Sequence, residues 1–175
     1  MKKKTILELN RINTEQFRDT PKIPVSVLLD DIRSLNNIGS VFRTSDAFTI
    51  SHIFLCGITA TPPSPDIHKT ALGAEYSVEW SYHDDAVALT TQLSKQGMTI
   101  CALEQVHGSI PLQNFSFNRD SQYVIVVGNE VKGVNQQIVD IADYAIEIPQ
   151  YGTKHSLNVA ISAGIALWEA FKQLK

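Results

Sequence analysis

The sequence has few cysteines and no long apolar run. Its two cysteines among 175 residues, Cys56 and Cys101, each lie inside an apolar stretch, so we expect buried thiols rather than a disulfide. The longest strongly apolar run covers residues 124–127, far too short to cross a membrane. The basic start, Met1 to Lys4, is followed by no apolar signal segment. These absences argue against a disulfide scaffold and a membrane protein, and they favour the cytoplasm.

Several motifs of catalysis and metal binding are missing as well. The five histidines have no zinc-ligand spacing, and no Cys-x-x-Cys pair occurs. There is no Gly-x-Ser-x-Gly nucleophile elbow and no Gly-x-Gly-x-x-Gly dinucleotide fingerprint. The net charge of −3 argues against a broadly basic nucleic-acid-binding body, although it leaves room for a local basic patch. We therefore expect no metal, and no binding of nucleic acid through overall charge.

What is present is an alternation of strand-like and helix-like segments. Strands are predicted at residues 25–29, 52–57, 77–82, 98–103, 123–128 and 144–148. Helices are predicted at residues 38–48, 84–95, 135–142 and 156–174. Several strands are near-continuous apolar runs, which suit parallel strands covered on both faces. The pattern predicts an α/β fold with a mostly parallel six-stranded sheet flanked by helices.

The predicted domain organisation is simple. Residues 1–20 form a polar N-terminal arm or helix, and residues 21–175 form a single domain. The prolines at residues 62–65 mark a loop inside that domain. In a parallel α/β sheet, ligands gather at the carboxyl ends of the strands, so the loops that follow the strands are the first place to look for a site.

The first motif, residues 36–44, follows a predicted strand and opens a helix. It reads Asn-Asn-Ile-Gly-Ser-Val-Phe-Arg-Thr. A helix start offers free N–H groups and the positive end of the helix dipole, which both suit a phosphate. Arg43 adds a planar fork that binds phosphate bidentately. The alternative is that Asn37 only caps the helix and Arg43 is a solvated residue.

The second motif, residues 126–134, is a glycine-bounded turn after a buried strand. Gly128 and Gly133 have the four-residue gap of a P-loop, but no Lys-Ser or Lys-Thr pair follows them. A nucleoside triphosphatase is therefore disfavoured. What remains is a turn that carries the carboxylate of Glu130, which is either functional or simply solvated.

The third motif, residues 148–160, is a polar loop that leads into the last helix. Ser156 is a natural N-cap for that helix. Asn158 then falls in the first turn, where a side-chain amide is a mediocre helix former. That placement points to a functional role for Asn158, although a capping role also explains it.

Together, and in this order, the three motifs resemble those of the SpoU family of SPOUT methyltransferases. These are S-adenosylmethionine-dependent RNA ribose 2′-O-methyltransferases, and the resemblance covers residues 25–172. The matching positions are Asn37, Gly39, Arg43 and Thr44 in the first motif, Gly128, Glu130 and Gly133 in the second, and Ile148, Pro149, Gly152, Ser156, Leu157, Asn158 and Val159 in the third.

The resemblance implies a C-terminal trefoil knot and a homodimer with the last helix at its interface. On that helix, small residues form a stripe at helical spacing that permits close approach of a partner helix. The stripe consists of Ala160, Ala163 and Gly164 with Leu167. The alternative is that the stripe packs on the protein's own sheet.

The resemblance also implies roles for individual residues. The S-adenosylmethionine site is Leu103, Gly128, Glu130, Gly133, Ile148, Ser156, Leu157 and Asn158. The catalytic residue is Arg43, assisted by Asn37, Glu130, Ser156 and Asn158. A guanidinium resists deprotonation, so we favour a clamp on a phosphate and on the developing 2′-oxyanion over a general base.

The implied substrate is tRNA or rRNA. Because the net charge is negative, RNA binding must rest on a local patch. The candidate cations are Arg33, Arg43, Lys69, Lys132, Lys154 and the lysines at positions 2–4. Two alternatives remain open at this point. One is an inactive RNA-binding or assembly factor that retains the fold, and the other is a small-molecule methyltransferase on the same fold.

Overall fold

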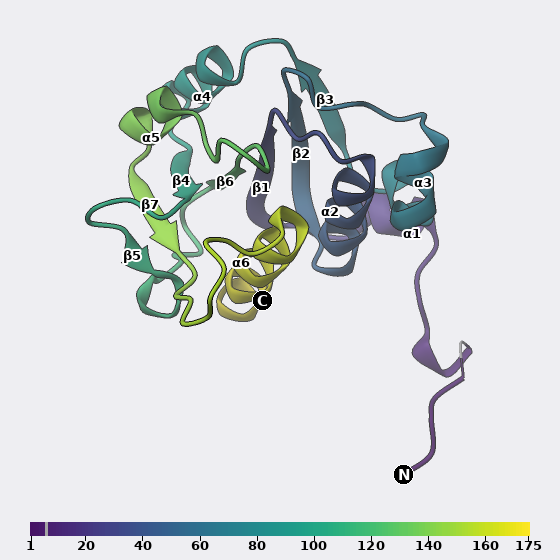
Figure 1. Cartoon of the computed structure of the whole chain (residues 1–175). Helices are drawn as coiled ribbons and strands as arrows, with labels where there is room; N and C mark the ends of the chain where they lie inside the picture. Colours follow the sequence, from purple (N-terminus) through teal and green to yellow (C-terminus); the bar gives the residue numbers. More distant parts are fainter. Residues whose placement is uncertain (6) are drawn as a thin grey trace.

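A computed structural model describes residues 1–5 and 7–175, which form one sheet between two layers of helices (Figure 1). The strands are β1 Ile23–Asp30, β2 Ile50–Cys56, β3 Trp80–His83, β4 Thr99–Leu103, β5 Ile110–Pro111, β6 Tyr123–Val127 and β7 Tyr144–Glu147. The helices are α1 Thr14–Asp19, α2 Leu35–Ala47, α3 Pro65–Ala71, α4 Ala86–Lys95, α5 Gln136–Ile141 and α6 Val159–Leu174, with short 3-10 turns at Leu7–Leu9, Ala74–Tyr76 and Leu112–Asn114.

The sheet confirms the predicted parallel architecture. Its strand order is β3-β2-β1-β6-β4-β7-β5, and every neighbouring pair is parallel. The sheet has seven strands rather than the expected six, because β5 is only two residues long and leaves no periodic signal in the sequence. The trefoil knot implied by the resemblance stays a prediction.

The core explains why the central strands read as continuous apolar runs. All five residues of β6 are buried. Because side chains alternate across a strand, Ile125 and Val127 join the cluster under α2 and α6, while Val124 and Val126 join the cluster under α4 and α5. Both faces of the sheet are therefore covered, as expected of a parallel sheet.

Two helices near the first motif differ from the prediction. α2 begins at Leu35 rather than at residue 38, and its N-cap is Ser34 rather than Asn37. The segment around the proline cluster is not only a loop, because α3 starts there with Ser64 as its N-cap. Pro65 fits the first turn of α3, since an N–H at that position has no intrahelical partner.

The last helix also begins later than expected. Its N-cap is Asn158, whose Oδ1 accepts hydrogen bonds from the N–H groups of Ala160 at 2.9 Å and Ile161 at 3.3 Å. The prediction that Ser156 caps this helix is therefore wrong. Asn158 serves as the cap because its side chain reaches both of these free N–H groups.

The small-residue stripe of α6 is not on the surface. Ala163 and Leu167 are fully buried, and a Cβ added at Gly164 would lie 3.8 Å from the Cγ2 of Thr44 on α2. The stripe therefore packs on the protein's own sheet and on α2, which corrects the expectation that it faces a partner. The apolar residues that α6 exposes are Ile161, Ile165 and Trp168.

The N-terminal residues divide into two parts. The chain before α1 extends away from the body (Figure 1). Phe17 of α1 is buried in the core, so α1 itself packs on the body. The domain boundary at residues 20 and 21 stays a prediction, and residue 6 of the expected arm lies outside the described residues.

Both cysteines are free and buried, as predicted. Burial raises the pKa of the Cys56 thiol and of the Cys101 thiol to about 12. Because the thiolate is the reactive form, neither side chain is suited to nucleophilic chemistry at neutral pH. Among the described helices, none has the length and apolar character needed to cross a membrane.

Candidate functional site

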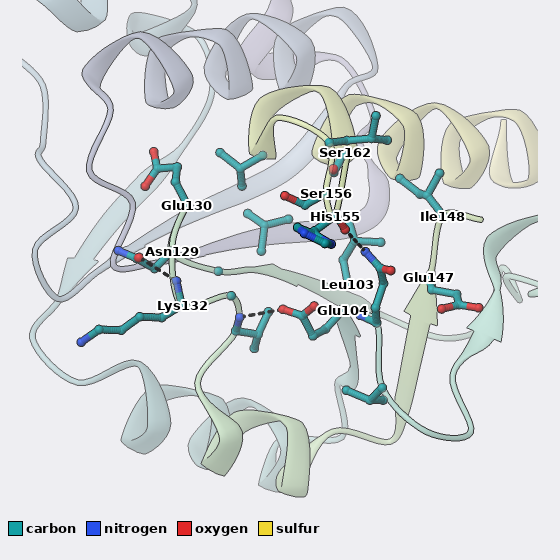
Figure 2. A pocket seen from close by; sticks show the side chains of 18 of the residues that line it. Leu103, Glu104, Asn129, Glu130, Lys132, Glu147, Ile148, His155, Ser156 and Ser162 are labelled. Atoms are coloured by element: carbon teal, nitrogen blue, oxygen red, sulfur yellow. Dashed lines mark hydrogen bonds between the residues drawn. The ribbon is translucent and has the colours of Figure 1, made fainter. Parts of the chain in front are cut away.

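The three motifs meet at the carboxyl edge of the sheet. The loops after β4, β6 and β7, which are neighbouring strands, surround a cavity of about 890 Å³ (Figure 2). That volume lies within the range of small-molecule sites. The predicted site residues in its lining are Leu103, Gly128, Glu130, Lys132, Gly133, Ile148, Ser156, Leu157 and Asn158.

The second motif is a tight turn closed by its two glycines. The Gly133 N–H donates to the Asn129 carbonyl at 2.8 Å, and Gly133 has a φ of +71°, which favours glycine. A Cβ at Gly128 would lie 2.1 Å from the Val134 nitrogen. The Asn129 side chain donates to the Asp31 carbonyl at 2.7 Å, which fixes this turn to the loop after β1.

Glu130 does not point freely into solvent. Its carboxylate accepts hydrogen bonds from the N–H groups of Arg33 at 2.9 Å and Ser34 at 3.0 Å, and from the Asn37 side-chain amide at 3.0 Å. Burial raises the pKa of Glu130, but these hydrogen bonds outweigh burial and the pKa lies below its usual value. The carboxylate therefore takes the two N–H groups directly before α2, while the N–H groups of Leu35 and Asn36 in the first turn have no acceptor within the described chain.

A chain of hydrogen bonds joins all three motifs. The Asn158 side-chain amide donates to the Asn37 Oδ1 at 3.1 Å, and the Asn37 amide in turn donates to Glu130. Asn158 also caps α6, while Glu130 holds the start of α2. The cavity wall and the two helices are thus linked through only three side chains.

The loop of the third motif presents unused backbone groups. Residues 151–158 are exposed, and none of their N–H groups donates a hydrogen bond to a protein atom within the described chain. Ser156, Leu157 and Asn158 from this loop line the cavity. Backbone donors beside a cavity are available to a polar ligand.

The structure does not bring every predicted cation to the cavity. Arg43 is exposed on α2 and lies outside the cavity lining, and its guanidinium makes no hydrogen bond or ion pair with the described residues, including Glu130. Arg33 and Lys69 border a second hollow of about 360 Å³ between the starts of α2 and α3. The Lys69 ammonium lies 2.6 Å from an Asp66 carboxylate oxygen. Lys154 is exposed on the third-motif loop.

Several lining residues were absent from the predicted site, and Glu104 and Gln105 are the two among them that connect the loops. The Glu104 carboxylate accepts from the Val134 N–H at 3.0 Å, and the Gln105 side chain donates to the His155 carbonyl at 3.0 Å. These contacts tie the loop after β4 to the second and third motifs. Their only signal in the sequence is their position directly after a strand. Within the described residues, no group of three or more His, Cys, Asp or Glu side chains is placed to hold a metal ion.

Comparison with known proteins identifies a family with this arrangement. Residues 24–168 match the model of the SpoU rRNA Methylase family. The chain is 30% identical over 150 residues to a tRNA (guanosine(18)-2′-O)-methyltransferase of Aquifex aeolicus, covering 84% of this chain and 68% of that protein. It is 28% identical over 147 residues to a 23S rRNA (guanosine-2′-O-)-methyltransferase of Nitrosomonas europaea, covering 84% of this chain and 55% of that protein.

Solved structures agree with the sequence comparison. The crystal structure of the A. aeolicus TrmH/SpoU tRNA modifying enzyme superposes with a TM-score of 0.80 at 27% identity, covering 91% of this chain and 81% of that one. An AdoMet-bound rRNA methyltransferase from Sinorhizobium meliloti gives a TM-score of 0.81 at 28% identity, covering 91% of this chain and 60% of that one.

Proposed function

Because this chain belongs to the SpoU rRNA Methylase family, we propose that it transfers a methyl group from S-adenosylmethionine to the ribose 2′-hydroxyl of a nucleotide in tRNA or rRNA. The observation that carries this proposal is the hydrogen-bonded link among the three motifs beside a cofactor-sized cavity. The transfer needs no metal; it needs a positioned donor and an activated hydroxyl.

The cavity suits S-adenosylmethionine, which supplies a methyl group on a positively charged sulfur. Leu103, Ile148 and Leu157 offer apolar contacts for the adenine ring, and the N–H groups of residues 155–158 offer donors for its nitrogens. Gly128 keeps the turn beside the cavity free of a side chain. We assign Gly133, Ser156 and Asn158 to the remaining wall of the cofactor site.

The geometry supports different roles for Glu130 and Arg43. Glu130 is a positioning residue, because its carboxylate holds the start of α2 and the Asn37 amide rather than facing Arg43. Arg43 lies on the same helix with its guanidinium unpaired within the described chain. We assign it to a phosphate next to the target ribose, where its charge also stabilises the developing 2′-oxyanion.

We expect RNA affinity to depend on a few cations around the site. Lys132 and Lys154 are exposed and make no ion pair within the described residues. Each phosphate contact contributes about −0.7 to −0.9 to the slope of log affinity against log salt concentration. Lys132→Ala and Lys154→Ala should therefore each make this slope shallower by about one unit in RNA-binding titrations.

The matched control for this prediction is Lys95→Ala, because Lys95 ends α4 shortly before β4 begins at Thr99, at the amino edge of the sheet and therefore away from the loops of the site. Its salt slope should equal that of the unmodified protein. A slope that neither Lys132→Ala nor Lys154→Ala changes would place the RNA elsewhere on the surface.

We further propose a homodimer that buries the exposed face of α6. Ile161, Ile165 and Trp168 are 57%, 38% and 50% exposed, and they lie four and three residues apart along one side of the helix. Trp168→Glu replaces the largest side chain of this face with a charged one and should weaken the dimer by about 2 kcal/mol or more, measured by sedimentation.

Leu72→Glu is the control for this substitution. Leu72 is 61% exposed at the end of α3, so this variant also replaces an exposed apolar side chain with a carboxylate, but away from α6. Trp168 also packs on Phe48 and Phe171, so thermal unfolding of the variant is measured alongside. A folded Trp168→Glu protein that dimerises like the unmodified one would contradict the proposed interface.

The proposed function is tested in cells by mapping ribose 2′-O-methylation across total RNA in a strain that lacks this protein and in its parent. We expect at least one tRNA or rRNA position to lose its methyl group, and to regain it when the gene is restored. Unchanged methylation at every position would contradict the proposal.

A further inference from the structure

We propose that Glu104 tunes the cofactor cavity toward the positively charged methyl donor and against the neutral product of the reaction. This inference rests on the proposed function, and it concerns a residue outside the motifs that identify the family. It starts from the position of Glu104, which follows β4 directly and lines the cavity (Figure 2).

The Glu104 carboxylate has hydrogen-bond partners but no cation. One oxygen accepts from the Gln105 N–H at 2.8 Å and the other from the Val134 N–H at 3.0 Å. A carboxylate has about four acceptor positions, so about half of its capacity remains for a ligand. None of the ion pairs in the described chain involves Glu104.

The rest of the lining does not neutralise this charge. Lys132 supplies the ammonium group of the lining, and Figure 2 shows its side chain extending away from Glu104. Glu130, the carboxylate on the second-motif turn, is already held by three donors at the start of α2. Glu147 is the third carboxylate of the lining, and Figure 2 shows its side chain directed away from Glu104. Of these three carboxylates, Glu104 is therefore the one that a hydrogen bond to the second-motif turn fixes in the cavity wall with no ion pair in the described chain.

The reaction changes the charge of the ligand in this cavity. Methyl transfer breaks the bond between the sulfonium sulfur and the methyl carbon and forms a bond from that carbon to the ribose 2′-oxygen. The electron pair stays on sulfur, which becomes a neutral thioether, and the hydroxyl proton leaves to solvent. S-adenosylmethionine thus carries a net positive charge at neutral pH, whereas S-adenosylhomocysteine carries none.

A fixed negative charge in a partly enclosed cavity distinguishes these two ligands, which are otherwise almost identical in shape. Opposite charges attract far more strongly in a cavity than in bulk water, because the effective dielectric constant is lower. The Glu104 carboxylate therefore favours binding of the donor and eases release of the product. Its hydrogen bond to Val134 keeps the charge at a fixed place in the wall.

The test compares the affinities of S-adenosylmethionine and S-adenosylhomocysteine by isothermal titration calorimetry, with the full chain and no RNA. Glu104→Gln removes the charge and keeps an acceptor oxygen for the Val134 N–H. We expect it to lower the ratio of donor affinity to product affinity by about tenfold, which corresponds to about 1.4 kcal/mol. Sinefungin carries a positively charged amine near the place of the sulfonium. Glu104→Gln should therefore lower its affinity, relative to that of the product, as it does for the donor.

Two further variants separate charge from structure. Glu104→Asp keeps the charge and should keep the affinity ratio close to that of the unmodified protein, even if both affinities fall. Glu79→Gln removes an exposed carboxylate outside the cavity and should change neither the donor affinity nor the product affinity.

The outcomes are distinguishable. If Glu104→Gln leaves the ratio of donor affinity to product affinity unchanged, whether or not both affinities fall, the inference is wrong while the proposed function stands. If the unmodified protein binds neither ligand, the proposed function fails and the inference falls with it.

Discussion

Arg43→Ala should reduce methyl transfer by about 100-fold or more while leaving S-adenosylmethionine affinity within about twofold. Removal of one donor that stabilises a developing oxyanion typically has an effect of about this size or larger on the chemical step. Cofactor binding should survive because Arg43 lies on α2, outside the cavity lining, and holds no described residue in place. The measurements are transfer of a labelled methyl group to RNA and calorimetric titration of the cofactor.

Arg43→Lys is the informative companion variant. It keeps the positive charge but replaces a planar, bidentate fork with a single ammonium group, so we expect activity to stay low. Transfer by Arg43→Ala within about tenfold of the unmodified protein, equivalent to about 1.4 kcal/mol of barrier, would remove Arg43 from the catalytic role.

Gly128→Ala should abolish most cofactor binding. The added Cβ would lie 2.1 Å from the Val134 nitrogen and 2.2 Å from the Gly133 carbonyl carbon, so the backbone of the second-motif turn must move. Because that turn forms one wall of the cavity, we expect S-adenosylmethionine affinity to fall by about 100-fold, or about 2.8 kcal/mol. Overpacking of this kind also lowers the free energy of unfolding by about 1–3 kcal/mol, measured by urea denaturation.

Gly152→Ala is the matched control from the third motif. A Cβ added at Gly152 meets no atom within 4 Å, and its backbone does not require glycine. This variant should bind the cofactor and unfold like the unmodified protein. A Gly128→Ala protein with the same cofactor affinity as Gly152→Ala would show that the turn does not form the cofactor wall.

The location of the candidate site at the sheet edge was predictable, because it depends on local patterns. Apolar runs identified the parallel strands, and the loops after them held Gly128, Glu130 and Ile148, which the structure brings to one cavity. A parallel sheet places all such loops at the same edge, so their convergence followed from the fold class alone.

The contacts within the site were not predictable in the same way. Glu130 and Asn37 lie 93 residues apart, and Asn37 and Asn158 lie 121 residues apart, so no local spacing indicates their hydrogen bonds. The resemblance placed Glu130 in the site but not at the start of α2. Glu104 was missed because a single carboxylate after a strand is common in surface loops.

The prediction of which face of α6 is exposed was wrong for a related reason. The stripe of small residues has the right helical spacing for a partner helix and equally for the protein's own sheet. Only packing decides between them, and here Ala163 and Leu167 are fully buried against the sheet layer. The exposed positions on α6 are the larger Ile161, Ile165 and Trp168, which a search for small residues passes over.

The most direct test of the central claim is chemical. The protein is incubated with methyl-labelled S-adenosylmethionine and total RNA from a strain that lacks it, and the RNA is then hydrolysed with alkali. Alkaline cleavage requires a free 2′-hydroxyl beside each phosphate, so ribose 2′-O-methylation leaves its label in alkali-resistant dinucleotides. We expect the label in that fraction, and its absence with Arg43→Ala. Label recovered in mononucleotides, which indicates base methylation, or no label in RNA at all, would contradict the account.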